Sequence, residues 1–200
     1  MASDSGGVGY DKTILRTFVA LPIAEFLYSR LAEAQNHLRK AKADVKWTTP
    51  EQQHLTIQFL GNTRQDQVPI ILERLSTVVQ NIRSFSLSLN SVGAFPSTRS
   101  PRVLWVGLQG DLDSLNRLQR NIEDQMKPLG FKPENRLFHP HLTLGRVRTP
   151  KSLKELTQLL DEIKSFSAES FMVKELIFFQ SVLTPKGAIY TRLGTVLFSV

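Results

Sequence analysis

Two short stretches of this sequence carry the same pattern of residues that can do chemistry. Residues 54–57 are His-Leu-Thr-Ile and residues 141–144 are His-Leu-Thr-Leu, and we call them the first and the second tetrad. Side chains alternate between the two faces of a β-strand, so the histidine and threonine of each tetrad share one face and the leucine takes the other. Each tetrad therefore presents an imidazole and a hydroxyl on one face of a strand whose opposite face is apolar.

Two imidazoles that face one cavity can cleave a phosphodiester by acid–base catalysis. A neutral imidazole removes a proton from the nucleophile, and a protonated one donates a proton to the leaving oxygen. Thr56 and Thr143 can hydrogen-bond the non-bridging oxygens, where negative charge builds in the transition state. Hydrolysis of a 2′,3′-cyclic phosphate is the simplest such reaction, because ring strain lowers its barrier. His54 and His141 are thus the candidate acid and base, in an order that the residues alone leave open.

The tetrads also admit two simpler interpretations. A strand histidine is often structural, but two matched tetrads in one chain disfavour that interpretation for the pair. A metal site needs a third ligand, and neither tetrad has a His-x-x-x-His pattern beside it. We therefore expect no metal and no other cofactor.

Strict alternation also assigns the residues that follow each tetrad. It places Gln58 on the histidine face and Phe59 in the core. It turns Arg146 toward the apolar face, whereas a bulge or strand end at Gly145 would redirect this arginine toward a bound phosphate. The direction of Arg146 therefore depends on whether the strand is regular.

Composition narrows the class of protein. The chain has 200 residues, of which 25 are Lys or Arg and 18 are Asp or Glu, and it has no cysteine. The missing cysteines exclude disulfides and thiolate chemistry, and the formal net charge of +7 favours an anionic partner. Residues 132–154 around the second tetrad carry six basic residues and one acid. We expect a cytoplasmic monomer with no membrane segment and no obligatory protein partner.

Hydrophobic periodicity predicts an α+β fold. Apolar stripes at helical spacing and runs of β-branched or aromatic residues follow one another with short connections, and neighbouring strands suggest antiparallel pairing. The repeated tetrads predict a duplicated, bilobal fold with a pseudo-twofold axis, in which two antiparallel sheets line a central cleft and the helices lie outside. We expect one such domain over residues 13–200, after a flexible leader over residues 1–12. The expected helices span 24–42, 66–82, 111–129 and 152–165, and the expected strands span 14–21, 45–48, 54–60, 85–95, 103–108, 141–147, 171–183 and 189–198.

The sequence around the tetrads resembles a known family. Residues 47–50 (Trp-Thr-Thr-Pro) lead into residues 54–61, and residues 140–146 contain the second tetrad. This combination resembles the two-histidine phosphoesterases, and more narrowly the RNA 2′,3′-cyclic phosphodiesterases, also described as 2′-5′ RNA ligases. Further similarity lies in residues 16–21, 93–96 and 102–105, so that the resemblance covers about residues 14–198.

The resemblance implies a reaction and roles for the tetrad residues. It implies metal-free hydrolysis of RNA or nucleotide 2′,3′-cyclic phosphate ends to 2′-phosphates. His54 would be the proton donor, His141 the proton acceptor, and Thr56 and Thr143 would hold phosphate oxygens. A 2′,5′-oligonucleotide phosphodiesterase, an enzyme that trims RNA 3′ ends, and a non-catalytic RNA or nucleotide binder are the alternatives.

Four further residues are candidates for substrate binding. Arg146 and Arg102 could hold phosphate, or they could be solvated surface arginines. Phe18 and Trp47 could stack on a base or belong to the core.

Overall fold

The computed structural model describes residues 14–134, 137–185 and 187–199, and the leader expected over residues 1–12 lies outside this range. Within these residues the named strands form one nine-stranded sheet with antiparallel pairing throughout. Their order is β7-β4-β5-β6-β3-β1-β8-β9, and β2 pairs with β6. The strands are β1 (Ile14–Pro22), β2 (Val45–Trp47), β3 (His54–Arg64), β4 (Phe85–Ser97), β5 (Ser100–Gly110), β6 (His141–Val147), β7 (Ser167–Val173), β8 (Glu175–Thr184) and β9 (Gly187–Leu197).

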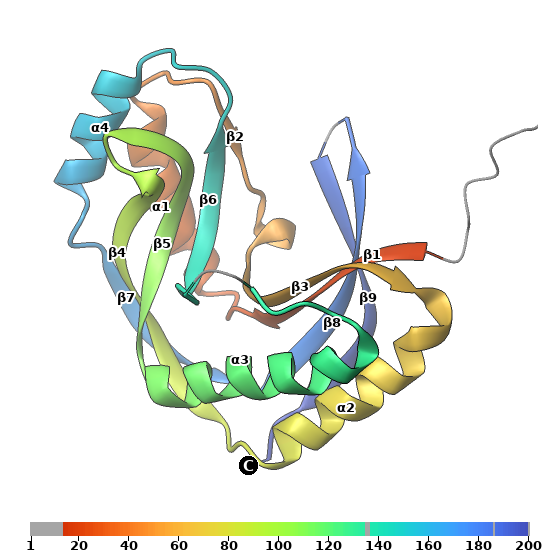
Figure 1. Cartoon of the computed structure of the whole chain (residues 1–200). Coiled ribbons are helices and arrows are strands. Elements are labelled where there is room, and N and C mark those ends of the chain that lie inside the picture. Colours follow the sequence, from red (N-terminus) through yellow and green to blue (C-terminus); the bar gives the residue numbers. More distant parts are fainter. Residues whose placement is uncertain (1–13, 135–136, 186, 200) are drawn as a thin grey trace, which may run out of the picture.

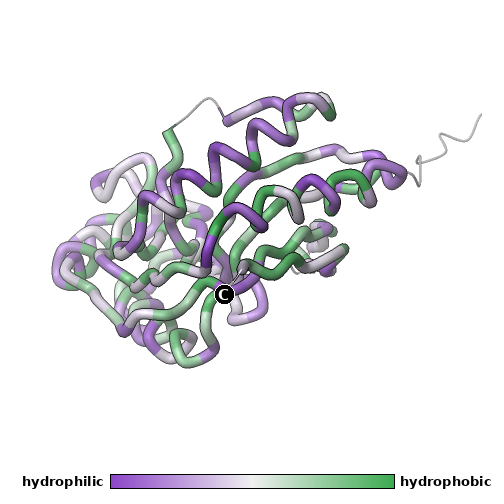
Figure 2. The backbone as a smooth tube through the Cα atoms, turned by 90° about the horizontal axis from the view of Figure 1, so that it is seen from below, coloured by the Kyte–Doolittle hydropathy of each residue, from purple (hydrophilic) through white to green (hydrophobic). Residues whose placement is uncertain are grey.

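In the described part of the chain, four α-helices cover the outside of this sheet (Figure 1). Helices α2 (Val68–Gln80) and α3 (Leu112–Met126) pack together, and α2 contacts β9 while α3 contacts β3. Helices α1 (Leu27–Arg39) and α4 (Leu153–Glu162) also pack together, and α1 contacts β7 while α4 contacts β5. Hydrophilic and hydrophobic residues alternate along the helical turns, which leaves an apolar stripe to pack on the sheet (Figure 2). No helix in the described part of the chain is long and apolar enough to cross a membrane.

The sheet consists of two halves that meet at one pair of residues. The first half contains β3, β1, β8 and β9, and the second contains β6, β5, β4, β7 and β2. The only registered pair between β3 and β6 within the described residues is Leu55 with Leu142, and both leucines are buried in the core. The α+β class and the duplicated architecture are confirmed, while the two expected sheets are joined through this pair.

Each tetrad ends in a β-bulge. Ala20 pairs with Thr56 and Val19 with Gln58, so Ile57 has no partner on β1. In the same way Trp105 pairs with Thr143 and Leu104 with Gly145, so Leu144 has no partner on β5. The fourth residue of both tetrads is therefore the extra residue of a bulge, and the alternation of faces shifts by one residue after it.

The bulge in β3 overturns the assignment of two residues by strict alternation. Gln58, expected on the histidine face, is buried on the core side, and Phe59, expected in the core, is 47% exposed. The physical reason is that the unpaired Ile57 takes up one step of the pleat, so Ile57 and Gln58 are both buried in succession.

The strand expected over residues 171–183 is in fact two strands. The chain breaks at Lys174: β7 pairs with β4 in the second half, and β8 pairs with β1 in the first. The β-forming composition on both sides of Lys174 is continuous, and it carries no signal that the chain crosses between halves there.

We call the pair of Leu55 with Leu142 the bridge between the halves, and truncation of either leucine should lower the stability of the protein. We expect Leu142→Ala or Leu55→Ala to lower the free energy of unfolding by about 2–5 kcal/mol, because each leaves a cavity in a closed core. Urea denaturation measures this loss. Leu137→Ala is the control, because Leu137 is 98% exposed and such changes usually stay within about 0.5 kcal/mol. Equal stability of the Leu142 and Leu137 variants would contradict the role of the bridge.

Candidate active site

The register at the bridge gathers the polar residues of both tetrads. In an antiparallel pair, the neighbours of two opposed residues also oppose one another, so His54 lies across from Thr143 and Thr56 lies across from His141. Because the two leucines point into the core, these four side chains lie on the opposite, cleft face of the sheet. The structure thus brings the four tetrad residues together.

His54 is enclosed by aromatic rings. Its imidazole stacks on Phe18 with 4.8 Å between ring centroids, and it meets the edge of Tyr190 at 5.1 Å. This burial lowers the pKa of His54 to about 4; a hydrogen bond to the backbone of Gln52 opposes the shift, and the charge of the neighbouring His141 adds to it. In the protein without substrate, His54 is therefore neutral near pH 7.

His141 is held by the backbone two residues before it. Its Nδ1 lies 2.7 Å from the carbonyl oxygen of His139. A carbonyl oxygen can only accept, so Nδ1 carries the proton of the neutral ring and Nε2 keeps a free lone pair. Burial lowers the pKa of His141; the His139 hydrogen bond opposes this, and the charges of His139 and Arg146 add to it. A neutral His141 with a free Nε2 has the properties of a general base.

Arg146 lies on the cleft face. It pairs with Lys46 on β2 and Val103 on β5. Burial is the main cause that shifts the pKa values of both His141 and Tyr190, and the charge of Arg146 acts on each of them in the lowering direction. The bulge that we considered at Gly145 is present one residue earlier, at Leu144, and it has the effect considered there: it turns Arg146 away from the core. An exposed guanidinium near His141 and Tyr190 is well placed to bind an anion.

The two aromatic candidates do not line the cleft as base platforms. Phe18 is 1% exposed and packs beneath His54, so it supports the imidazole and has no free face for a base. Trp47 pairs with Gly145 on the side opposite to Arg146, packs against the core, and lies under the guanidinium of Arg39 at 4.7 Å. The expected substrate contact of Trp47 therefore finds no support in its position, because β2 turns its ring toward α1.

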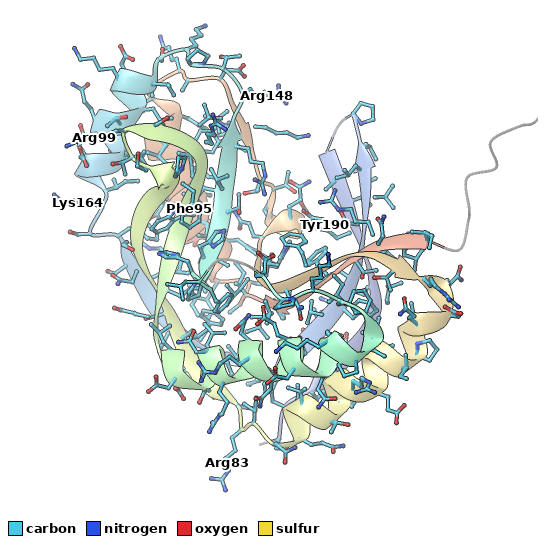
Figure 3. The ribbon with its side chains drawn as sticks, in the orientation of Figure 1. Arg83, Phe95, Arg99, Arg148, Lys164 and Tyr190 are labelled. Atoms are coloured by element: carbon cyan, nitrogen blue, oxygen red, sulfur yellow. The ribbon has the colours of Figure 1, made fainter. Side chains whose placement is uncertain are left out.

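A cavity of about 550 Å³ opens next to the tetrads. Thr56 and His141 lie at its wall together with Arg102, and it is bordered by aromatic and loop side chains that include Phe59, Phe95, Phe138 and His139. Figure 3 shows Phe95 on the second half and Tyr190 on the first, on either side of the space between them. Sequence reasoning missed Phe59, Phe95 and Tyr190. Phe59 could have been found only from the bulge. Phe95 lies in residues 93–96, whose resemblance to the family assigned it no role, and Tyr190 had no signal beyond its aromatic type.

The comparison with protein families matches the chain twice. The model described as LigT like Phosphoesterase matches residues 21–105 and again residues 106–190. Each match contains one tetrad, so the internal repeat seen in the sequence corresponds to two copies of one unit.

Known relatives extend over nearly the same length. The RNA 2′,3′-cyclic phosphodiesterase of Archaeoglobus fulgidus is 35% identical over 182 residues, which cover 90% of this chain and 98% of the relative. The enzyme of the same name from Methanothermobacter thermautotrophicus is 33% identical over 177 residues, which cover 88% and 95%.

Solved structures share the fold. A protein of Thermus thermophilus superposes with a TM-score of 0.77 at 25% identity, covering 92% of this chain and 98% of that one. The apo form of Escherichia coli LigT has a TM-score of 0.75 at 21% identity, covering 94% of this chain and all of that one. With the family model matched over most of its length and relatives above 30% identity, the chain belongs to the LigT-like phosphoesterase family.

Proposed function

We propose that this protein hydrolyses RNA 2′,3′-cyclic phosphate ends to 2′-phosphomonoesters, with His54 and His141 as the acid–base pair and without a metal. The observation that carries the proposal is the register at Leu55 and Leu142, which gathers two imidazoles and two hydroxyls on one face. The names of the relatives, RNA 2′,3′-cyclic phosphodiesterase, support the choice of substrate. Among the described residues no three His, Asp or Glu side chains gather as metal ligands would. The proposed mechanism uses no metal ion.

The mechanism uses one proton transfer at each histidine. Nε2 of His141 takes a proton from water as the water oxygen attacks phosphorus. The bond between phosphorus and O3′ breaks, and protonated His54 donates its proton to O3′, which leaves a 2′-phosphate and a free 3′-hydroxyl. The hydroxyls of Thr56 and Thr143 and the guanidinium of Arg146 stabilise the charge on the non-bridging oxygens. Proton exchange with solvent restores both imidazoles.

His54 must become protonated when the substrate binds. Burial holds this imidazole neutral in the free protein, with a pKa of about 4. An anion placed next to a buried group favours its charged form, and the effect is large because little water screens it. The phosphate of the substrate is therefore expected to raise the pKa of His54 and so create the acid that the reaction needs.

A second candidate keeps the same pair and changes the substrate to a 2′,5′-linked oligonucleotide. The observation that favours it is the cavity of about 550 Å³ beside His141 and Thr56, which exceeds the space needed by a phosphate alone and is in the size range of small-molecule sites. Turnover compared between cyclic-phosphate-ended RNA, 2′,3′-cyclic AMP and a 2′,5′-linked dinucleotide separates the two substrates. A non-catalytic binder would bind these ligands in a salt-sensitive way and turn over none.

Removal of either histidine should abolish most of the activity. We expect His54→Ala and His141→Ala each to lower kcat on a cyclic-phosphate-ended oligoribonucleotide by about 10²–10⁴-fold, because each removes one proton transfer. A phosphatase-coupled assay in excess EDTA measures this rate. His37→Ala is the matched control, because His37 pairs with Glu162 on the helices, away from the tetrads. Wild-type turnover in the double tetrad variant, or loss of wild-type activity in EDTA, would refute the proposal.

Phosphate binding should change the titration of His54. In the free protein we expect the imidazole resonances of His54 to titrate near pH 4, because burial lowers its pKa to about 4. Saturating inorganic phosphate should move this midpoint upward, since the anion favours the imidazolium. Two-dimensional NMR of histidine side chains, assigned with His54→Asn, measures both midpoints. A midpoint that is the same with and without phosphate would contradict the source of the acid.

A further inference from the structure

The bulge in β6 is held by two polar side chains outside the tetrads. The carbonyl oxygen of Leu144, the bulge residue, accepts from the backbone N–H of Thr48 at 3.0 Å and from Gln35 Nε2 at 2.9 Å. The hydroxyl of Thr48 lies 3.0 Å from the same oxygen and 2.8 Å from the carbonyl oxygen of Thr143. Two carbonyls of the second tetrad are thus served by one threonine and one glutamine.

The pair of side chains is itself fixed. Gln35 is 7% exposed in the middle of α1, and its Nε2 also donates to the carbonyl oxygen of Thr48 at 2.9 Å. Thr48 directly follows β2, which pairs with β6 beside the bulge. Helix α1, the end of β2 and the bulge of β6 therefore form one connected hydrogen-bond network on the core side of the second tetrad.

A bulge needs such support because it interrupts the ladder. The extra residue has no partner on the neighbouring strand, and a buried carbonyl left without a donor costs about 1–3 kcal/mol. If β6 were regular, Leu144 would be paired, and the alternation of faces would turn Arg146 toward the core. The direction of Arg146 thus depends on a bulge whose own stability depends on donors from Thr48 and Gln35.

We propose that Thr48 and Gln35 are positioning residues for phosphate binding: through the carbonyls of Thr143 and Leu144 they maintain the bulge that directs Arg146 into the cleft. Neither side chain needs to touch the substrate, because each acts through the backbone of β6. This inference rests on the proposed function for the identity of the anion that Arg146 binds.

A double-mutant cycle tests this role. Thr48→Val keeps the shape of the side chain and removes its hydroxyl donor, whereas Thr48→Ser keeps the donor. We expect Thr48→Val to lower kcat/KM on a cyclic-phosphate-ended oligoribonucleotide by about tenfold, which corresponds to the coupling usual within one hydrogen-bond network. In an Arg146→Ala background the same change should cost less than about twofold, because the residue that it positions is already gone. Thr48→Ser should restore most of the rate.

Two controls separate positioning from general damage. Thr157→Val removes a hydroxyl that also donates to a backbone carbonyl, that of Thr98, in the same half of the molecule, and it should leave kcat/KM unchanged. Should Thr48→Val fail to fold, as judged by its thermal transition, Gln35→Met takes its place in the same cycle.

The outcomes are distinct. Multiplicative losses from Thr48→Val and Arg146→Ala, or full activity of Thr48→Val and Gln35→Met, would overturn the positioning role. If wild type turned over no cyclic phosphate, the proposed function would fail. The same cycle would then be run on the affinity for inorganic phosphate by calorimetry: non-additive losses there would support the positioning role, and additive ones would overturn it.

Discussion

The arrangement of the site depends on one antiparallel contact, the pairing of Leu55 with Leu142. Each leucine is the second residue of its tetrad and is buried in the core, so the contact fixes both the faces and the relative register of the two strands. A slip of one residue would turn the histidine and the threonine of one tetrad into the core. His54 and His141 therefore lie diagonally across the strand pair, and their relative position is fixed because the neighbouring leucines determine the register.

The two bulges, at Ile57 and Leu144, determine which side chains beyond the tetrads reach the site. With regular pairing, β3 would continue straight along β1 and β6 along β5 beyond the tetrads. Instead, the extra residue bends and twists each strand at the fourth position of its tetrad. The bulges also reassign faces: Phe59 reaches the cavity and Arg146 reaches the cleft. The repeated aliphatic residue at the end of each tetrad is therefore more than core packing, because it supplies the residue at which the alternation shifts.

The α+β class and the duplication could be predicted from the sequence, because the repeated tetrads and the hydrophobic periods are local signals. Prediction failed where long-range pairing decides. Nothing near Ile57 indicates a bulge, so Gln58 and Phe59 were assigned to the wrong faces, and nothing near Lys174 indicates that β7 and β8 belong to different halves. Trp47 was ambiguous for the same reason: its direction follows from the pairing of β2 with β6, which brings it beneath Arg39.

The pseudo-twofold frame holds two histidines in unlike surroundings, and this difference bears on their roles. His54 is neutral mainly because aromatic rings exclude water from it, a cost that a bound anion can reverse. For His141, the charges of His139 and Arg146 add to burial in lowering the pKa, and the charge of Arg146 stays when the substrate arrives. An incoming phosphate therefore has more effect on His54, because the charge that lowers the pKa of His54 comes from the other imidazole, whereas a permanent guanidinium acts on His141. This asymmetry favours proton donation by His54 and proton acceptance by His141, and it derives from the surroundings of the tetrads, since the tetrads themselves are nearly identical.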